Sequence, residues 1–358
     1  MIRTLLARVG LVATAAGVAT LLTAAPAAAH GADAPDGTDY RTRTTGVTPQ
    51  RPGLEVRVVE AGARLELTND TGRAVEVVGY SGEPYLRITP DGVFENSRSP
   101  ATYLNRTIAG DTALPADADP AAQPTWRRVA DGTTARWHDQ RALWQESAPP
   151  AAVRAAPDRE HRVRDWTIPL RDGADQVTIG GTVDWVPPPD AYTWWAVTIV
   201  GLLAVGALGL LAAASPAGAR ALSAVGTLLV VGGVVAVAYP LGRELDAGAQ
   251  GVGGVTLGLL SGQIWSLLTG LGAIAAGCYA LARRPAADFA VALAGACLAL
   301  FAGAANAAVF ARSIAPVPWP PEIARVMVAL VLITGTGATA AGVLRLHAAA
   351  STPTPART

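Results

Sequence analysis

The sequence predicts a mixed fold, in which an all-β domain of immunoglobulin-like sandwich type is followed by an α-helical bundle of five transmembrane helices. Three observations lead to this prediction. A short apolar leader occupies residues 1–29, apolar and polar residues alternate in several runs of 53–190, and long apolar runs dominate 191–347. Alternation with a period of two is typical of strands, and runs of about 20 apolar residues are long enough to span a bilayer.

The leader has the features of a cleavable signal peptide. Two arginines precede the apolar stretch 9–22, and the segment ends in Pro26-Ala27-Ala28-Ala29. Small residues at these positions suit a signal peptidase, so we expect cleavage after Ala29 and a mature chain that begins at His30. An uncleaved first helix is the alternative, but the apolar stretch is short for a membrane span.

The polar region after the leader predicts an exported β domain. Residues 30–52 are rich in Asp, Thr, Arg and Pro and predict a flexible arm ahead of the domain at 53–190. Both cysteines, Cys278 and Cys297, lie outside this domain, which therefore has no disulfide and must be held together by its core. Short strands joined by turns are typical of an antiparallel sandwich. The expected strands are Leu54–Val58, Leu65–Leu67, Val75–Val77, His161–Leu170 and Val177–Val186.

Five apolar runs are each long enough to cross a hydrocarbon core of about 30 Å. They are Tyr192–Ala213, Ala221–Leu241, Thr256–Ala282, Ala286–Phe310 and Ile323–Leu346. With the polar domain outside, Arg220, Arg283, Arg284, Arg345 and Arg357 lie inside, and Arg243, Arg312 and Arg325 lie outside. This excess inside agrees with the positive-inside rule. An odd number of spans predicts a multi-pass cell-membrane protein whose tail, residues 348–358, is cytoplasmic.

Few polar residues are expected inside the membrane. Arg243, Glu244 and Asp246 are predicted to fall in a loop and Asp288 at an inner edge, so the spans lack an obvious charge pathway. Asn306 is an uncharged polar residue within a span, as is Gln263, and interhelical hydrogen bonding is the role that we expect for both.

Charge restricts the partners of the exported domain. Residues 30–190 carry 18 Arg against 24 Asp and Glu, although the whole chain has no formal net charge. An acidic domain is a poor partner for nucleic acid. The expected partners are therefore the lipid bilayer and other envelope proteins, and not nucleic acid.

One long stretch, residues 79–105, departs from simple strand patterning and is dense in aromatic, amide, carboxylate and Arg groups. Such loops carry function more often than regular elements do. In the alternative interpretation the loop satisfies itself, with Arg87 or Arg98 paired to Asp91 or Glu95. The candidate ligand or partner surface consists of Tyr80, Glu83, Tyr85, Arg87, Asn96, Arg98, Tyr103 and Asn105.

The sharpest local cluster is Trp137-His138-Asp139-Gln140-Arg141. His138 and Asp139 are adjacent, so on a strand they face opposite sides and cannot both point at one ligand without a bend. Trp126 and Trp144 lie close to this cluster in the sequence. The alternative is that the three tryptophans fill the core and that His138 forms hydrogen bonds within it.

Three segments of the exported domain resemble segments of actinobacterial envelope proteins that carry a signal peptide and an exported domain. They are Gly-Tyr-x-Gly-Glu-Pro-Tyr-Leu-Arg at 79–87, Arg-Ser-Pro-Ala-Thr-Tyr-Leu-Asn at 98–105 and Trp-His-Asp-x-Arg at 137–141. The resemblance implies a cell-envelope location and names no reaction.

A looser resemblance is to bacterial copper-handling envelope proteins of the CopC type, which begin after export with a histidine and have a small β-sandwich. A terminal histidine can chelate Cu(II) through its α-amine and imidazole. The resemblance implies a metal site in which His30 is completed by His138 and Asp139. The chain has no cysteine outside the spans and only two methionines, so a Cu(I) route has no support.

The sequence therefore favours a ligand-binding or partner-binding β domain on a membrane platform and no enzymatic activity. Copper or another divalent metal is the alternative. An envelope enzyme is the weakest alternative, because the chain has no Gly-x-Ser-x-Gly or His-Glu-x-x-His motif and no phosphate-binding loop.

Overall fold

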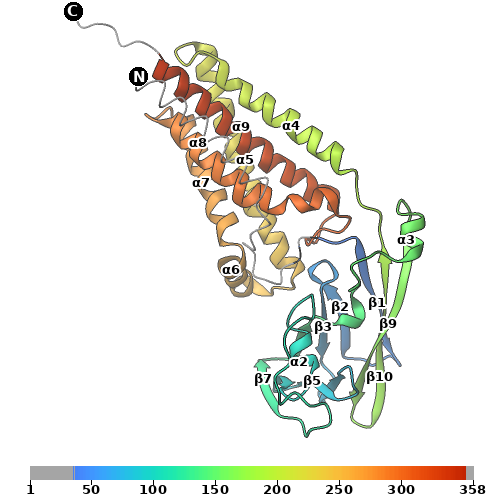
Figure 1. Ribbon diagram of the computed structural model, residues 1–358. Coiled ribbons are helices and arrows are strands. Elements are labelled where there is room, and N and C mark those ends of the chain that lie inside the picture. The colour runs from blue at the N-terminus through green and yellow to red at the C-terminus, as the bar shows by residue number, and fades with distance from the viewer. Residues whose placement is uncertain (1–34, 36, 352–358) are drawn as a thin grey trace, which may run out of the picture.

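The computed structural model describes residues 35 and 37–351, which form a β domain and an elongated helical bundle (Figure 1). The leader and His30 lie outside the described residues. Five helical segments of the bundle are long and apolar enough to cross a membrane, as the sequence predicts for a multi-pass protein. These segments are Ala191–Leu210, Pro216–Asp246, Ile264–Leu281, Ala287–Ala311 and Pro321–Ser351.

The β domain consists of two open antiparallel sheets. Seven strands pair in the order β1-β10-β9-β4-β5-β6-β7, and three pair in the order β2-β3-β8. The strands are β1 (Tyr40–Thr48), β2 (Leu54–Val59), β3 (Arg64–Asn69), β4 (Val75–Val78), β5 (Pro84–Thr89), β6 (Gly92–Asn96), β7 (Trp126–Ala130), β8 (Thr134–Trp137), β9 (His161–Asp172) and β10 (Asp175–Trp185). All five predicted strands are present, whereas the open sheets do not confirm the immunoglobulin-like sandwich.

Both sheets contribute to one apolar core. Leu65 and Leu67 of β3 pack with Ile88 of β5, Ile168 of β9 and Ile179 of β10, and each of these side chains is almost completely buried. The alternation read from the sequence places such residues on the inward face of each strand. Short helical turns connect the strands, and the longest of them are α2 (Ala101–Leu104) and α3 (Ala151–Ala155).

The sequence did not predict β1, β5, β6, β7 or β8, and β1 falls where a flexible arm was expected. Residues 40–48, within the expected flexible arm 30–52, form β1, which pairs with β10 from Tyr40 opposite Trp185 to Thr48 opposite Thr178. Polar composition concealed β1, because most of its residues are polar. Tyr40 and Val47 pack on the core, and backbone hydrogen bonds to β10 hold the strand at the sheet edge. The arm prediction is therefore wrong for residues 40–48.

The helical bundle differs from the predicted spans in two places. The run Thr256–Ala282 is broken at Gln263 into two helices, and the fourth span changes from α-helix to π-helix and then to 3₁₀-helix. The elements are α4 (Ala191–Ala207), η3 (Leu208–Leu210), α5 (Pro216–Asp246), α6 (Gly251–Gly262), α7 (Ile264–Leu281), α8 (Ala287–Leu298), η4 (Ala299–Gly303), η5 (Ala304–Ala311) and α9 (Pro321–Ser351).

The placement of the charges near the helix ends also needs correction. Arg243, Glu244 and Asp246 occupy the last turns of α5 rather than a loop, and Arg243 is only 6% exposed. Arg345 lies within α9 and donates to Asp288 at 2.6 Å. Hydropathy locates the apolar part of a span, but its helix continues into interfacial turns where charged side chains find partners.

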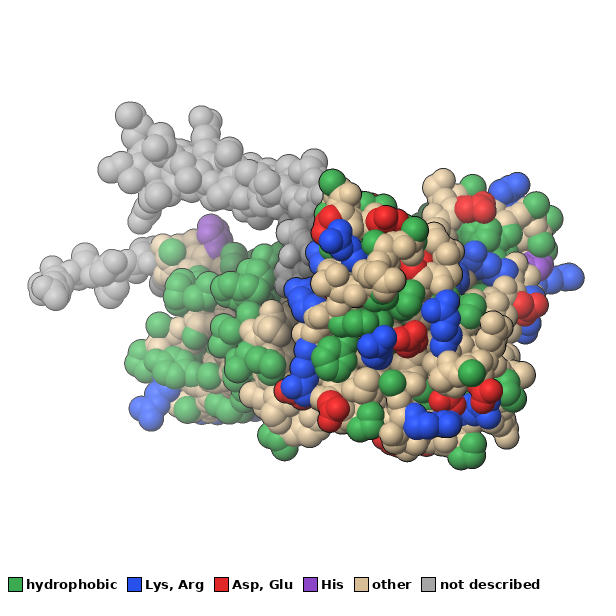
Figure 2. Space-filling view, turned by 90° about the horizontal axis from the view of Figure 1, so that it is seen from below, with side chains coloured by type: hydrophobic (Ala, Val, Ile, Leu, Met, Phe, Trp, Pro, Cys, Tyr) green, Lys and Arg blue, Asp and Glu red, His purple; other side chains and the backbone are tan. Residues whose placement is uncertain are grey.

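The two regions present different surfaces. Charged side chains of both signs are spread over the β domain, whereas hydrophobic side chains cover the helices (Figure 2). Within the bundle, small residues allow close contact. A Cβ atom added at Gly277 of α7 would lie 2.5 Å from the carbonyl oxygen of Gly226 on α5.

Candidate functional site

The β domain is fastened to the bundle where β1 begins. Thr38 and Ile314 exchange backbone hydrogen bonds of 3.1 and 2.9 Å. The buried Asp39 carboxylate accepts from the backbone N–H of Ser313 at 2.9 Å and from Arg312 Nη1 at 2.7 Å. The segment between the fourth and fifth spans therefore contacts the two residues that directly precede β1.

A second set of contacts joins the β domain to the end of α5. Asp246 Oδ2 accepts from the backbone N–H of Ala61 at 2.8 Å, and Arg243 Nη2 donates to the carbonyl oxygen of Pro35 at 3.0 Å. Arg136 of β8 donates to the carbonyl oxygen of Gly248, just after α5. The β domain is therefore bonded to the bundle at two places, the segment at Arg312 and Ser313 and the end of α5.

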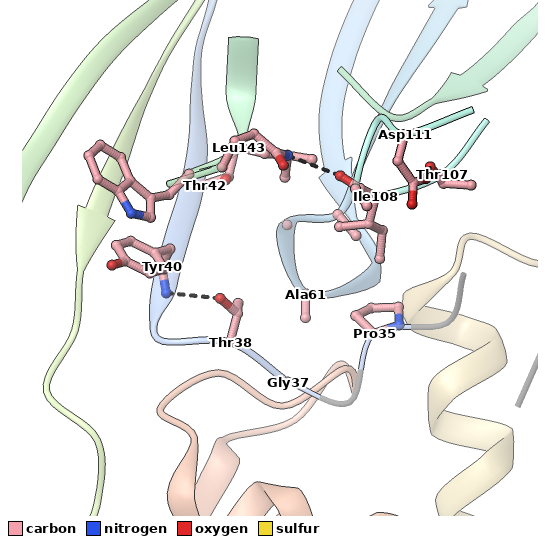
Figure 3. A pocket seen from close by; sticks show the side chains of 15 residues that line it. Pro35, Gly37, Thr38, Tyr40, Thr42, Ala61, Thr107, Ile108, Asp111 and Leu143 are labelled. Atoms are coloured by element: carbon pink, nitrogen blue, oxygen red, sulfur yellow. Dashed lines mark hydrogen bonds between the residues drawn. The ribbon is translucent and has the colours of Figure 1, made fainter. Parts of the chain in front are cut away.

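A cavity of about 530 Å³ lies at this junction. Thr38, Gly37 and Pro35 form the side nearest the bundle, and Ile108 and Leu143 lie across from them (Figure 3). The complete lining is Pro35, Gly37, Thr38, Tyr40, Thr42, Ala61, Gly62, Ala63, Thr107, Ile108, Ala109, Asp111, Leu143, Trp144 and Gln145. We call this cavity the junction pocket.

The lining combines an aromatic pair with neutral polar groups. Tyr40 stacks on Trp144 with ring centroids 5.8 Å apart, and the buried indole N–H of Trp144 has no acceptor among the described residues. Asp111 accepts from the Thr107 hydroxyl at 2.9 Å, and Gln145 donates to the carbonyl oxygen of Ile108 at 3.0 Å. Asp111 is the one charged side chain among the described lining residues.

One wall of the pocket has a strained backbone. The short turn η1 (Glu60–Gly62) contains two consecutive non-glycine residues with positive φ, Glu60 at 55° and Ala61 at 54°. Left-handed conformations of this kind cost of order 1–3 kcal/mol each and concentrate at functional sites. Burial raises the pKa of the Glu60 carboxyl, against the opposing effect of Arg64, whose Nη1 lies 3.3 Å from Glu60 Oε1.

The predicted ligand surface does not line this pocket, and its most buried members bond to one another. The Tyr80 hydroxyl donates to Asn105 Oδ1 and accepts from the backbone N–H of Gln140 at 3.0 Å. Burial raises the pKa of both Tyr80 and Tyr85, so each keeps its phenolic proton. This arrangement is internal to the β domain, and it leaves Asn105 Nδ2 and Gln140 Oε1 buried without a hydrogen-bond partner among the described residues.

Glu83 and Asn96 are also interior groups. Glu83 Oε2 accepts from the backbone N–H of Ser81 at 2.9 Å, and Oε1 accepts from the Ser99 hydroxyl at 2.7 Å. Asn96 donates to the carbonyl oxygen of Pro84 at 2.8 Å. These hydrogen bonds hold the turns next to β5 and β6 against those strands.

The remaining three predicted residues are more exposed. Arg87 pairs with Glu76 at 2.7 Å and lies 4.1 Å above the Trp126 ring. Arg98 donates to the carbonyl oxygen of Asp117 at 3.0 Å, and the Tyr103 hydroxyl donates to that of Ser97 at 3.0 Å. Neither arginine uses the Asp91 or Glu95 carboxylate that the self-satisfied interpretation suggested, but each has a partner within the domain.

These networks position two segments of the pocket wall. The Gln140 side chain donates to the carbonyl oxygens of Leu104 and Thr107 at 3.1 and 3.2 Å. Through this amide and the Tyr80 hydroxyl, the segment that begins at Gln140 is fixed beside the loop at 104–111. Both segments contribute pocket-lining residues. Residues of the predicted surface therefore do not line the pocket themselves but help to position the segments that do.

The two described members of the predicted metal site have separate hydrogen-bond partners. His138 Nδ1 donates to the carbonyl oxygen of Ala63 at 2.8 Å, and Nε2 accepts from Arg64 Nε at 3.1 Å. Asp139 accepts from Trp137 Nε1 at 3.0 Å and from Arg141 Nη2 at 2.8 Å. The described part of the chain holds no group of three or more His, Cys, Asp or Glu suited to a metal.

Sequence reasoning missed the residues that line the pocket. Tyr40 and Thr38 belong to the segment predicted as a flexible arm, and Thr107 and Asp111 follow the stretch 79–105. Trp144 alone had a signal, since it belongs to a crowded interval of three tryptophans between 126 and 144.

Comparison of the chain with protein-family models, with curated proteins and with solved structures found no match.

Proposed function

We propose that this chain is a multi-pass protein of the cell envelope whose extracytoplasmic β domain binds a small molecule in the junction pocket. The observation that carries the proposal is the pocket itself. Its volume of about 530 Å³ falls within the range of about 300–1,000 Å³ that is common for ligand sites. Its walls combine apolar side chains with a few polar groups, which is the usual composition of such sites.

The lining favours an uncharged ligand that has an apolar face and hydrogen-bond acceptors. An anionic ligand would meet the Asp111 carboxylate and no cation among the described lining residues. The Tyr40 and Trp144 rings suit the apolar face. An acceptor on the ligand would satisfy the Trp144 N–H once the ring turns toward the cavity.

Several parts of the proposal come from the sequence. They are export by a leader that is cleaved after Ala29, a cytoplasmic C-terminus, an immunoglobulin-like β domain and binding rather than catalysis. Copper binding through His30 stays a separate prediction of the sequence.

The test is a ligand screen on the full chain in lipid nanodiscs. A library of uncharged and anionic small molecules is scored by saturation-transfer NMR, and each hit is repeated on Ala109→Trp, which adds a bulky ring to the pocket lining. The control is Ala121→Trp, on an exposed turn remote from the lining. We expect uncharged hits that Ala109→Trp weakens at least about tenfold and Ala121→Trp leaves unchanged. Hits that are insensitive to Ala109→Trp would overturn the proposal.

A further inference from the structure

A buried arginine connects the junction pocket to an irregular part of the bundle. Arg243 of α5 is only 6% exposed, and its guanidinium donates in two directions. Nη2 donates to the carbonyl oxygen of Pro35, which lines the pocket, and Nη1 donates to Asn306 Oδ1 at 3.3 Å. The interhelical hydrogen bond expected for Asn306 is therefore present, with a charged partner.

Asn306 lies where the fourth span loses its α-helical geometry. The span is α-helical through Leu298, becomes the π-helix η4, and continues as the 3₁₀-helix η5. Asn306 Nδ2 donates to the carbonyl oxygen of Ala302 within η4 at 2.9 Å. π-Helical segments and 3₁₀ stretches within helices are frequent at functional sites and hinges.

The far end of η5 is also connected to the pocket. Arg325 of α9 donates to the carbonyl oxygens of Val309 at 3.1 Å and Arg312 at 2.8 Å. Two residues further on, Ile314 pairs with Thr38, which lines the pocket. Both ends of η5 are thus linked to the same edge of the junction pocket, through Pro35 at one end and Thr38 at the other.

These contacts make the shape of the junction pocket and the conformation of η5 depend on each other. A buried guanidinium that loses one acceptor is costly unless its other contacts adjust. A displacement of Pro35 by a molecule in the pocket therefore favours a new position for Arg243, and with it a new position for Asn306. Coupling between two sites acts equally in both directions.

We propose that occupancy of the junction pocket is coupled through Arg243 to the conformation of η5, so that the β domain and the fourth span respond together. The inference rests on the proposed function for the natural occupant of the pocket. Its test uses no ligand, so the two proposals can fail separately.

The test is hydrogen exchange on the full chain in nanodiscs, read at the pocket edge (37–63) and at η5 (304–311). Arg243→Gln is compared with Arg345→Gln, which removes an equally buried arginine at the opposite end of the bundle. We expect exchange to accelerate about tenfold in both segments for Arg243→Gln, within the usual range for coupled sites. For Arg345→Gln we expect changes only near residues 218 and 288.

A variant with a bulky ring added to the pocket lining supplies the second measurement. Ala109→Trp should change exchange at η5 in the wild-type background and have no effect there when combined with Arg243→Lys, whose single ammonium cannot reproduce the forked contact. Acceleration at η5 without any change at the pocket edge in Arg243→Gln would overturn the proposal. An undiminished effect of Ala109→Trp in the Arg243→Lys background would also overturn it.

Discussion

The β domain and the helical bundle bury polar groups in different ways. In the β domain, carboxylates and amides such as Glu83, Asn96 and Asp139 lie in the interior and accept or donate several hydrogen bonds each. In the bundle, the buried arginines lie toward the ends of the helices, and small residues bring the helices together between them. A domain that folds in water can enclose a complete polar network, whereas a membrane span keeps charge near its ends.

The comparison also explains where the junction pocket lies. At the junction, the polar network of the β domain meets the charged end of α5. Both the packing of the sheets and the packing of the helices end there. Pro35, Thr38 and Ala61 bond to the bundle on one side, while loops held by Gln140 close the other. The junction pocket therefore lies where the packed sheets of the β domain end and the packed helices of the bundle begin.

The largest expected effect is the loss of a buried ion pair in the β domain. Asp139→Ala should lower the free energy of unfolding by about 3–5 kcal/mol, because Arg141 and the Trp137 N–H would lose their buried acceptor. Denaturation of the full chain in detergent, followed by tryptophan fluorescence, measures this. The control Asp175→Ala removes an exposed pair with Arg51 and should cost about 1 kcal/mol or less. Equal losses in the two variants would contradict the difference in burial.

A smaller effect is expected from crowding the bundle. Gly277→Val should cost about 1–3 kcal/mol, because its Cβ would lie 2.5 Å from Gly226 O on the neighbouring helix. Gly272→Val is the matched control on the same helix, since nothing lies within 4 Å of its added Cβ. Thermal unfolding in detergent, monitored by circular dichroism, should separate the two variants. If both melt together, close α5–α7 contact does not stabilise the bundle.

The pH dependence of two junction carboxylates should have opposite signs. Burial raises the pKa of Glu60 above its ordinary 4.5, so the stability that the protonated form provides is lost as the pH rises through the raised value. Glu60→Gln keeps a neutral group and should be more stable than the wild type at pH 7 by about 1 kcal/mol or less. Melting temperatures between pH 4 and pH 7 measure the difference, which should shrink toward pH 4.

Glu66 supplies the contrasting case. Burial opposes its ionisation, but hydrogen bonds from Arg57 and Arg136 lower the pKa of Glu66 below its ordinary 4.5. The stability that its ionised form provides is therefore present above pH 4.5 and is lost as the pH falls through the lowered value. Glu66→Gln should be less stable than the wild type at pH 7. The same sign for both variants would contradict these assignments.

No effect is expected from His138 on copper binding. His138→Asn should leave the Cu(II) affinity of the mature chain unchanged, because both ring nitrogens already bond to Ala63 and Arg64. Electron paramagnetic resonance during a Cu(II) titration measures this, and one extra residue before His30 tests the terminal chelate separately. A tenfold loss of affinity in His138→Asn would place the histidine among the ligands.

Several features of the candidate site could be anticipated only in part. The motif residues between 79 and 105 and between 137 and 141 stand out in the sequence, and in the structure most of them form hydrogen bonds inside the β domain. A segment dense in polar and aromatic groups has the same local pattern whether it faces a ligand or its own domain. Only the three-dimensional position of Tyr80 beside Gln140 and Asn105 distinguishes the two cases.

The sequence by itself determined the succession of a β region and a helical region, the five apolar spans and five of the ten described strands. Those features depend on local periodicity and on the length of apolar runs, which are written in consecutive residues. The tertiary structure alone decided that residues 40–48 form an edge strand, that Arg243 is buried against Asn306, and that a pocket exists. These features depend on pairing between segments more than 50 residues apart, and no local pattern encodes which distant backbone or side chain will satisfy a polar group.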